Sequence, residues 1–183
     1  HRERIMNDRI HTSRKQRGLS MIELLVAVLV LAIGVLGITA LQMVSLQNNR
    51  GALFRAEAVQ LAYDMMDRIR ANPEGAVPGG AYDGLALTDA PPGAANCLAG
   101  NCSQAQMVTF DQAVWKCSLG NFNANAQCTG FRAAGVLPPE DDQPGLPEGD
   151  GSIVVDGAGV VTITVQWTEP DGQVGSVTID SQG

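Results

Sequence analysis

Residues 24–41 read LLVAVLVLAIGVLGITAL, and this stretch decides the fold of the chain. Only Thr39 is polar among these residues, and the run is about long enough to cross the hydrocarbon core of a bilayer as a helix. A cleaved secretory signal has a shorter apolar core followed by a small-residue cleavage site, whereas the helical pattern here continues without a break. The stretch therefore favours a membrane helix over a signal for simple secretion.

The charges on the two sides of this stretch are unequal. Residues 1–18 contain six of the twelve basic residues, although the whole chain has a net charge of -7. Basic residues that precede a membrane helix usually stay in the cytoplasm, so we expect the acidic body of the chain on the other side. An acidic body repels phosphate backbones, and the sequence therefore predicts no nucleic-acid binding.

The composition also argues against an enzyme. Both histidines, His1 and His11, lie in the basic leader, so a form without the leader has no imidazole, the commonest general base and metal ligand. The sequence contains no nucleophile elbow, no Walker-type loop and no dinucleotide-binding turn. We expect no catalytic residue, no cofactor and no metal site, although calcium binding by the acidic loop 138–150 stays open.

Glu23 stands at the start of the apolar run, between Ile22 and Leu24. A carboxylate there is destabilised by several kcal/mol unless it meets a cation or takes up a proton. If a peptidase cut between Gly18 and Leu19, the new α-ammonium would lie four residues before Glu23, one helical turn away on the same face. In a filament, the amine of one subunit could instead meet the Glu23 of a neighbour.

The segment RGLSMIEL at residues 17–24 resembles the cleavage signal of type IV prepilins, with its basic leader, terminal glycine and glutamate at the fifth mature position. The resemblance implies cleavage after Gly18 by a prepilin peptidase of the inner membrane, and N-methylation of Leu19. Leu19 replaces the usual phenylalanine, which keeps the site apolar. The expected parts are a cleaved leader (1–18), a transmembrane or filament-core helix (19–42) and a globular pilin head (43–183).

Beyond Leu41 the helical pattern becomes amphipathic and runs to Ala71, where Pro73 stops it. The C-terminus predicts an antiparallel meander of three strands at residues 152–155, 160–168 and 173–180. One face of this sheet is apolar and needs a partner, which the apolar stripe of the long helix supplies. We therefore expect an α+β roll similar to the pilin head. The stripe consists of Phe54, Ala58, Leu61, Met65 and Ile69.

A short helix is predicted after Ser103, which can cap it together with Gln106 three residues later. The proline-rich and acidic stretch 136–151 predicts a surface loop. Residues expected on one face of the short helix are Met107, Phe110, Val114 and Cys117.

Four cysteines lie in the part that is expected to leave the cytoplasm, and an even number in an oxidising compartment favours disulfides. Three pairings are possible. The helix between Cys102 and Cys117 would hold these two roughly 20 Å apart, beyond disulfide reach. We therefore predict that Cys97 pairs with Cys102 and Cys117 with Cys128.

The head contains the segments LAYD (61–64), DRIRANP (67–73), Cys102-Ser103, Trp115-Lys116 and LPEGDGS (146–152). Together these segments resemble the minor pilins called type IV pilus modification proteins, or PilV. The resemblance implies a scarce pilus component that primes filament assembly and supports twitching motility and adhesion. It also implies a single-pass inner-membrane location with the head in the periplasm, followed by incorporation into the extracellular pilus. Implied partners are the inner-membrane assembly platform, other minor pilins, the major pilin and a tip adhesin.

Two other functions share some of these features. A pseudopilin of a type II secretion apparatus has the same leader and helix, so loss of twitching rather than of exoprotein secretion would separate the two. A membrane-anchored binding module that never polymerises would show no cleavage at Gly18.

Overall fold

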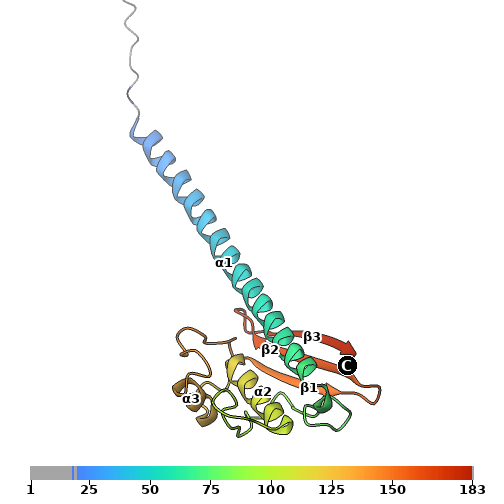
Figure 1. Cartoon of the computed structure of the whole chain (residues 1–183). Helices are drawn as coiled ribbons and strands as arrows, with labels where there is room; N and C mark the ends of the chain where they lie inside the picture. The colour runs from blue at the N-terminus through green and yellow to red at the C-terminus, as the bar shows by residue number, and fades with distance from the viewer. Residues whose placement is uncertain (1–17, 19, 183) are drawn as a thin grey trace, which may run out of the picture. The chain divides into compact units, whose positions relative to one another are not determined.

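A computed structural model describes residue 18 and residues 20–182 of the chain. The chain divides into two units, residues 1–44 and residues 45–183, and helix α1 (Met21–Ala71) contributes to both (Figure 1). The long helix predicted from the sequence is therefore confirmed from Met21 onwards. Most of the basic leader, together with Leu19, lies outside the described residues.

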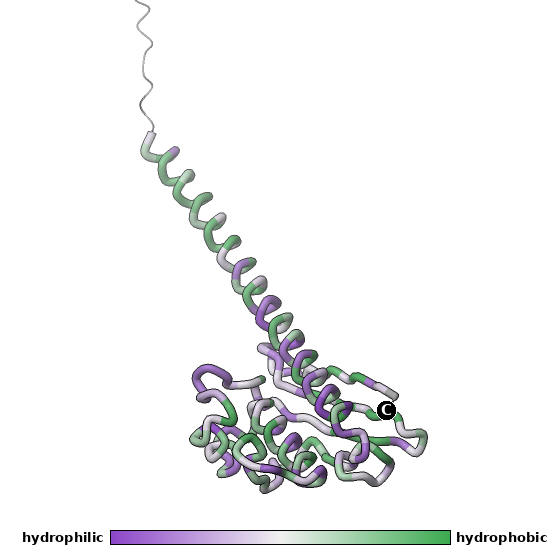
Figure 2. Tube along the Cα trace, viewed as in Figure 1, coloured by the Kyte–Doolittle hydropathy of each residue, from purple (hydrophilic) through white to green (hydrophobic). Residues whose placement is uncertain are grey.

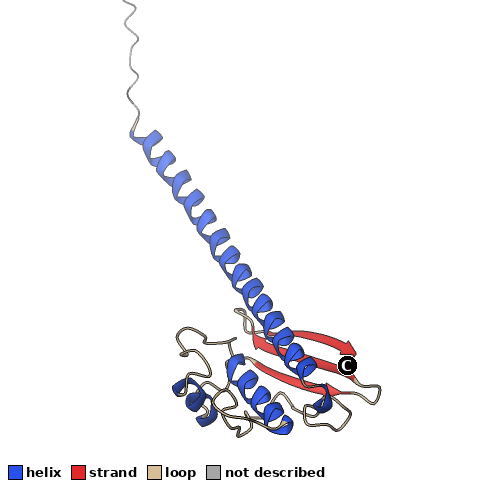
Figure 3. Cartoon of the chain, in the orientation of Figure 1, coloured by secondary structure: helices blue, strands red, loops and turns tan. Residues whose placement is uncertain are grey.

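The second unit contains an antiparallel sheet of three strands in the order β1 (Asp150–Val155), β2 (Val160–Thr168) and β3 (Val174–Gln182) (Figure 3). The predicted meander is confirmed, although β1 begins two residues earlier and β3 ends two residues later than the sequence indicated. Gly172 has a φ of 82°, in the left-handed region that the tight turn before β3 requires.

The core of this unit lies between one face of the sheet and the C-terminal part of α1. Along β2 every second side chain is buried, as the alternation in the sequence predicted. The stripe of α1 belongs to the same apolar cluster, which confirms the α+β fold. From β2 the cluster takes Val161, Ile163, Val165 and Trp167, and from α1 it takes Ala58, Leu61, Ala62, Met65, Met66 and Ile69, with Phe54 at its edge.

Helix α2 (Gln104–Leu119) begins with the predicted cap. The Ser103 hydroxyl accepts the Gln106 N–H, and the Gln106 side chain accepts the Ser103 N–H in return. The expected apolar face of α2 packs against α3 (Ala126–Ala133), where Phe110 meets Phe131 edge to face. The opposite side of α2 also contributes to the main core through Val108, Trp115 and Leu119, so the helix is buried on both sides.

Three features between α1 and the sheet differ from the sequence prediction. Helix α3 was not predicted, and a short 3₁₀ helix, η1 (Pro73–Gly75), follows α1. The stretch 136–151 is only partly a surface loop, because Leu137 and Leu146 are buried. The Leu146 N–H donates to the carbonyl of Leu119, and this close approach uses Gly120, where a Cβ would collide with the Leu146 carbonyl.

Two disulfides join the cysteines in the predicted pairing. Cys97 is bonded to Cys102 with their Cα atoms 5.5 Å apart, and Cys117 is bonded to Cys128 at 5.2 Å. The second bond ties α2 to α3, so it fixes the small apolar cluster between these helices.

Candidate functional site

The start of α1 carries the candidate site for processing and assembly. The Glu23 N–H lies 3.0 Å from the Ser20 carbonyl and 3.3 Å from the Ser20 hydroxyl, so Ser20 caps the helix. Gly18 precedes this cap as exposed, non-helical chain, and among the described residues no atom outside its chain neighbours lies within 4 Å of where its Cβ would be. The bond expected to be cut therefore lies just outside the helix, although Leu19 on its other side is not among the described residues.

Ser20 is a helix cap that the sequence analysis did not identify. The spacing Ser-x-x-Glu from Ser20 to Glu23 is the signature of a helix capping box, and it was available in the sequence. Glu23 lies in the first turn of α1, where the free N–H groups and the helix macrodipole favour a negative charge. No ion pair of Glu23 is formed with the residues that the structure describes, so the expected amine partner stays a prediction.

The N-terminal part of α1 is a continuous exposed apolar surface. Every large apolar side chain from Met21 to Val44 is more than half exposed, and by length and composition the helix can cross a membrane. Figure 2 shows hydrophobic residues along this part and a mixed pattern further on. Such a surface needs a bilayer or neighbouring helices to cover it.

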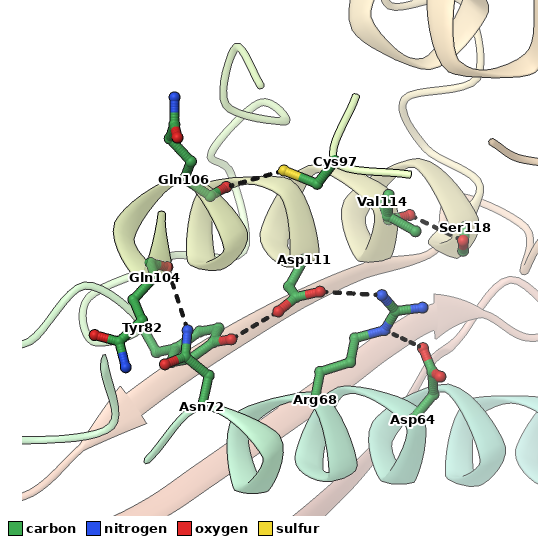
Figure 4. Close-up of polar contacts among 10 residues, drawn as sticks. All are labelled: Asp64, Arg68, Asn72, Tyr82, Cys97, Gln104, Gln106, Asp111, Val114 and Ser118. Carbon is green, nitrogen blue, oxygen red and sulfur yellow. Dashed lines mark hydrogen bonds and ion pairs between the residues drawn. The ribbon is translucent and has the colours of Figure 1, made fainter. Parts of the chain in front are cut away.

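A polar network in the second unit connects α1 to α2. The Arg68 guanidinium donates to Asp64 at 2.9 Å and to Asp111 at 3.1 Å, and the Tyr82 hydroxyl donates to the other oxygen of Asp111 at 2.7 Å (Figure 4). Burial, reinforced by the Asp111 charge, raises the pKa of Tyr82. The Asn72 amide donates to the carbonyl of Gln104 at the start of α2. These contacts fix the position of α2 on α1.

Lys116 is a fully buried cation. Its Nζ donates to Asp150 Oδ1 at 2.6 Å and to the carbonyls of Ala86 and Leu87 at 2.7 and 3.3 Å. Burial lowers the pKa of Lys116, and the Asp150 carboxylate opposes that effect. The ammonium has all three of its donors used, so it acts as a structural clamp between α2, β1 and the chain before them.

No group of three or more His, Cys, Asp or Glu side chains is placed to hold a metal ion within residue 18 and residues 20–182. The acidic residues of the 138–150 loop therefore do not converge on a common site in this structure.

Comparisons with known proteins agree with the geometry of α1. A family model for the prokaryotic N-terminal methylation motif matches residues 13–39, which include Gly18, Leu19 and Glu23. A family model described as Type IV pilin Tt1218 matches residues 40–113, so the two matches together cover residues 13–113 without a gap. Comparison with curated proteins gives no match, and comparison with solved structures gives none either.

An exposed apolar helix with a glutamate in its first turn, joined to an α+β unit with two disulfides, fits an α+β pilin fold. With both family matches on the same chain, the protein is a type IV pilin that anchors in a membrane and assembles with other pilins.

Proposed function

We propose that the chain is a minor pilin of the type IV pilus modification (PilV) type. It is made as a prepilin, cut between Gly18 and Leu19, methylated at Leu19 and built into the pilus as a scarce subunit. The observation that carries the proposal is the exposed apolar part of α1 with Glu23 in its first turn. Such a helix lies in the bilayer before assembly and in the filament core afterwards.

The proposed location follows from the charges and the cysteines. The basic leader keeps the N-terminus in the cytoplasm, so a head that begins near residue 43 lies in the periplasm, where disulfides are stable. The proposed partners are the prepilin peptidase, the inner-membrane assembly platform, the major pilin, other minor pilins and a tip adhesin. With these partners the chain primes filament assembly and supports twitching motility and adhesion.

The first test is N-terminal mass spectrometry of the protein from its own membrane. We expect a chain that begins at methylated Leu19, whereas an intact leader in mature membranes or pili would contradict the proposal. Gly18→Val should block cleavage, and because no clash with the described residues is expected at Gly18, a defect would be assigned to the peptidase step. Gly93→Val, at another open position, is the matched control and should be cleaved normally.

The second test concerns Glu23. Glu23→Gln keeps the shape and removes the charge, so the variant should still be cleaved, inserted and folded in its head. It should lose the pairing that draws the subunit into register, because an ammonium then stays unpaired in an apolar setting. The measurement is recruitment of tagged variant into sheared pili at equal membrane abundance. Equal incorporation of variant and wild type would rule out the intersubunit role.

Deletion of the gene separates this function from that of a pseudopilin. We expect loss of twitching with normal exoprotein secretion. The opposite phenotype would assign the chain to a type II secretion apparatus.

A further inference from the structure

The turn between β2 and β3, residues 169–173, contacts α1 a short way beyond the apolar part of that helix (Figure 1). The contact is made at Gly51, where a Cβ would lie 2.9 Å from Glu169 Oε2. A glycine inside a helix is less favourable than alanine by about 1 kcal/mol. Gly51 thus weakens α1 locally, and in this position it leaves room for an acidic side chain against the helix backbone.

The turn and the helix form the two walls of a surface hollow with a volume of about 310 Å³. Among the described residues, the side chains of Gln47, Asn48 and Glu169 form no hydrogen bond or ion pair. Asp171 uses Oδ1 to accept the N–H of Gln173. The hollow therefore presents two amide groups from the helix and two carboxylates from the turn. Its lining consists of Gln47, Asn48, Gly51, Glu169, Pro170 and Asp171.

The position of the hollow along α1 corresponds to the lipid headgroups. A helix needs about 20 predominantly apolar residues to cross the hydrocarbon core, and a span of that length counted from Leu24 ends at Met43. At 1.5 Å per residue, Gln47 lies about 6 Å beyond that end and Gly51 about 12 Å. The headgroup layer is roughly 5–8 Å thick on each side of the core, and a tilt of the helix brings both residues nearer to it. The hollow therefore faces the headgroups of the leaflet on the side of the body.

We propose that the hollow binds the headgroup of phosphatidylethanolamine while the chain is anchored in a membrane. The carboxylates of Glu169 and Asp171 accept hydrogen bonds from the lipid ammonium, and the amides of Gln47 and Asn48 donate to the lipid phosphate. The contact holds the β2–β3 turn at the bilayer surface. It goes beyond the proposed function, because it requires only a membrane-anchored chain and does not depend on a role as a minor pilin.

The charges of the hollow select this lipid. Like charges repel, so Glu169 and Asp171 disfavour an anionic headgroup such as that of phosphatidylglycerol. Phosphatidylcholine has a cation too, but its trimethylammonium group has no N–H to donate to a carboxylate. The ethanolamine headgroup supplies both the positive charge and the donors, and hydrogen bonds between charged partners are the stronger kind.

The first test is native mass spectrometry of the full-length chain, released from vesicles that contain phosphatidylethanolamine and phosphatidylcholine in equal amounts. We expect the chain to retain phosphatidylethanolamine in preference to phosphatidylcholine. Equal retention of the two lipids would overturn the proposal, and so would a preference for phosphatidylglycerol when that lipid is added. A preference that disappears with a chelator of divalent cations would overturn it as well, because a metal ion would then occupy the carboxylates.

Substitutions in the hollow test its role in this preference. Glu169→Gln should lower the preference about fivefold, which corresponds to the loss of about 1 kcal/mol from an exposed charge pair. Gly51→Ala should lower it too, because the new methyl group displaces the Glu169 carboxylate, although the helix itself gains stability. Glu140→Gln is the matched control, since it removes the same charge from an exposed residue outside the hollow. It should leave the preference unchanged, and an equal loss in this control would contradict a specific site.

The second test measures the depth of the turn by fluorescence quenching in vesicles whose headgroups carry a spin label. One full-length chain carries Pro170→Cys, and another carries Gly157→Cys at the opposite end of β2. All four native cysteines are in disulfides, so the fluorophore attaches to the new thiol. We expect stronger quenching at residue 170 than at residue 157. Equal quenching at the two positions would refute the placement of the turn at the headgroups.

The lipid site and the proposed function fail separately. A chain that is cut after Gly18 and recruited into pili but shows no lipid preference would refute the lipid site alone. A chain that keeps its leader in mature membranes but prefers phosphatidylethanolamine would refute the processing and support the site. Equal incorporation into vesicles and intact native disulfides show that each variant is folded, so a lost preference reports on the hollow.

Discussion

Replacing Lys116 by methionine should destabilise the head by about 3–5 kcal/mol, the typical effect of removing one partner of a buried ion pair. Methionine fills most of the same space but has no donor. Asp150, only 9% exposed, would then keep a buried negative charge with the Gly151 N–H as its remaining partner. The carbonyls of Ala86 and Leu87 would lose their shared donor too. An unsatisfied buried polar group is destabilising, so both losses lower the free energy of unfolding.

Thermal unfolding of the full-length chain in detergent measures this effect through the near-ultraviolet signal of its two tryptophans. At about 2–4 °C per kcal/mol for a domain of this size, we expect the midpoint to fall by roughly 10 °C. Arg70→Met is the matched control. It removes the charge from an exposed pair in which Arg70 and Asp67 are 53% and 72% accessible, and it should shift stability by less than about 1 kcal/mol.

A Lys116→Met variant that loses no more stability than Arg70→Met would refute the reasoning, because the buried ammonium would then make no net contribution. The double variant Lys116→Met with Asp150→Asn provides a second check. Because the asparagine is uncharged, the double variant should be more stable than Lys116→Met alone by about 1 kcal/mol or more.

Three further changes test the head. Asp83 accepts the N–H groups of Val155 and Gly79, and these hydrogen bonds lower the pKa of its carboxyl group below 3.8. The contribution of Asp83 to stability is therefore present above that value and is lost as the pH falls through the lowered pKa. Asp83→Asn should therefore weaken the loss of stability in acid, as measured by unfolding between about pH 6 and about pH 2. Cys117→Ser with Cys128→Ser should lower stability by about 2–4 kcal/mol in urea unfolding, and a change near zero would contradict the bridging role of that bond. Gly151→Ala should be destabilising by about 1–3 kcal/mol, because its Cβ would collide with the Trp115 ring, whereas Gly157→Ala, in open space, should unfold like wild type.

The elements that could be predicted are those whose sequence shows a clear period or cap. The apolar run and the stripe that follows it specify α1, and the alternation along β2 specifies its buried face. The pair Ser103 and Gln106 specifies the start of α2 because both halves of the capping box lie within four residues. In each case the decisive contacts are local, so a single sequence contains them.

The missed features depend on contacts between distant residues. Lys116 is buried because residues 86, 87 and 150 converge on it, and no local pattern indicates that a lysine on a helix will be enclosed. Leu146 is buried because its backbone pairs with Leu119. Helix α3 has only eight residues and contains Gly130, so its period is too short to detect, although the Asn125 side chain that caps it was a usable signal.

The proposed assembly role of Glu23 follows from the energetics at the start of α1. A carboxylate in the first turn gains about 0.3–1 kcal/mol from the macrodipole and the free N–H groups. Enclosure among apolar side chains is unfavourable for a carboxylate by several kcal/mol, which exceeds the gain at the helix end. At the membrane surface, water can hydrate the carboxylate, so the charge needs no cation there. The requirement for a cation therefore arises when the helix leaves the bilayer surface for the filament core, which is why we expect Glu23→Gln to affect recruitment and not insertion.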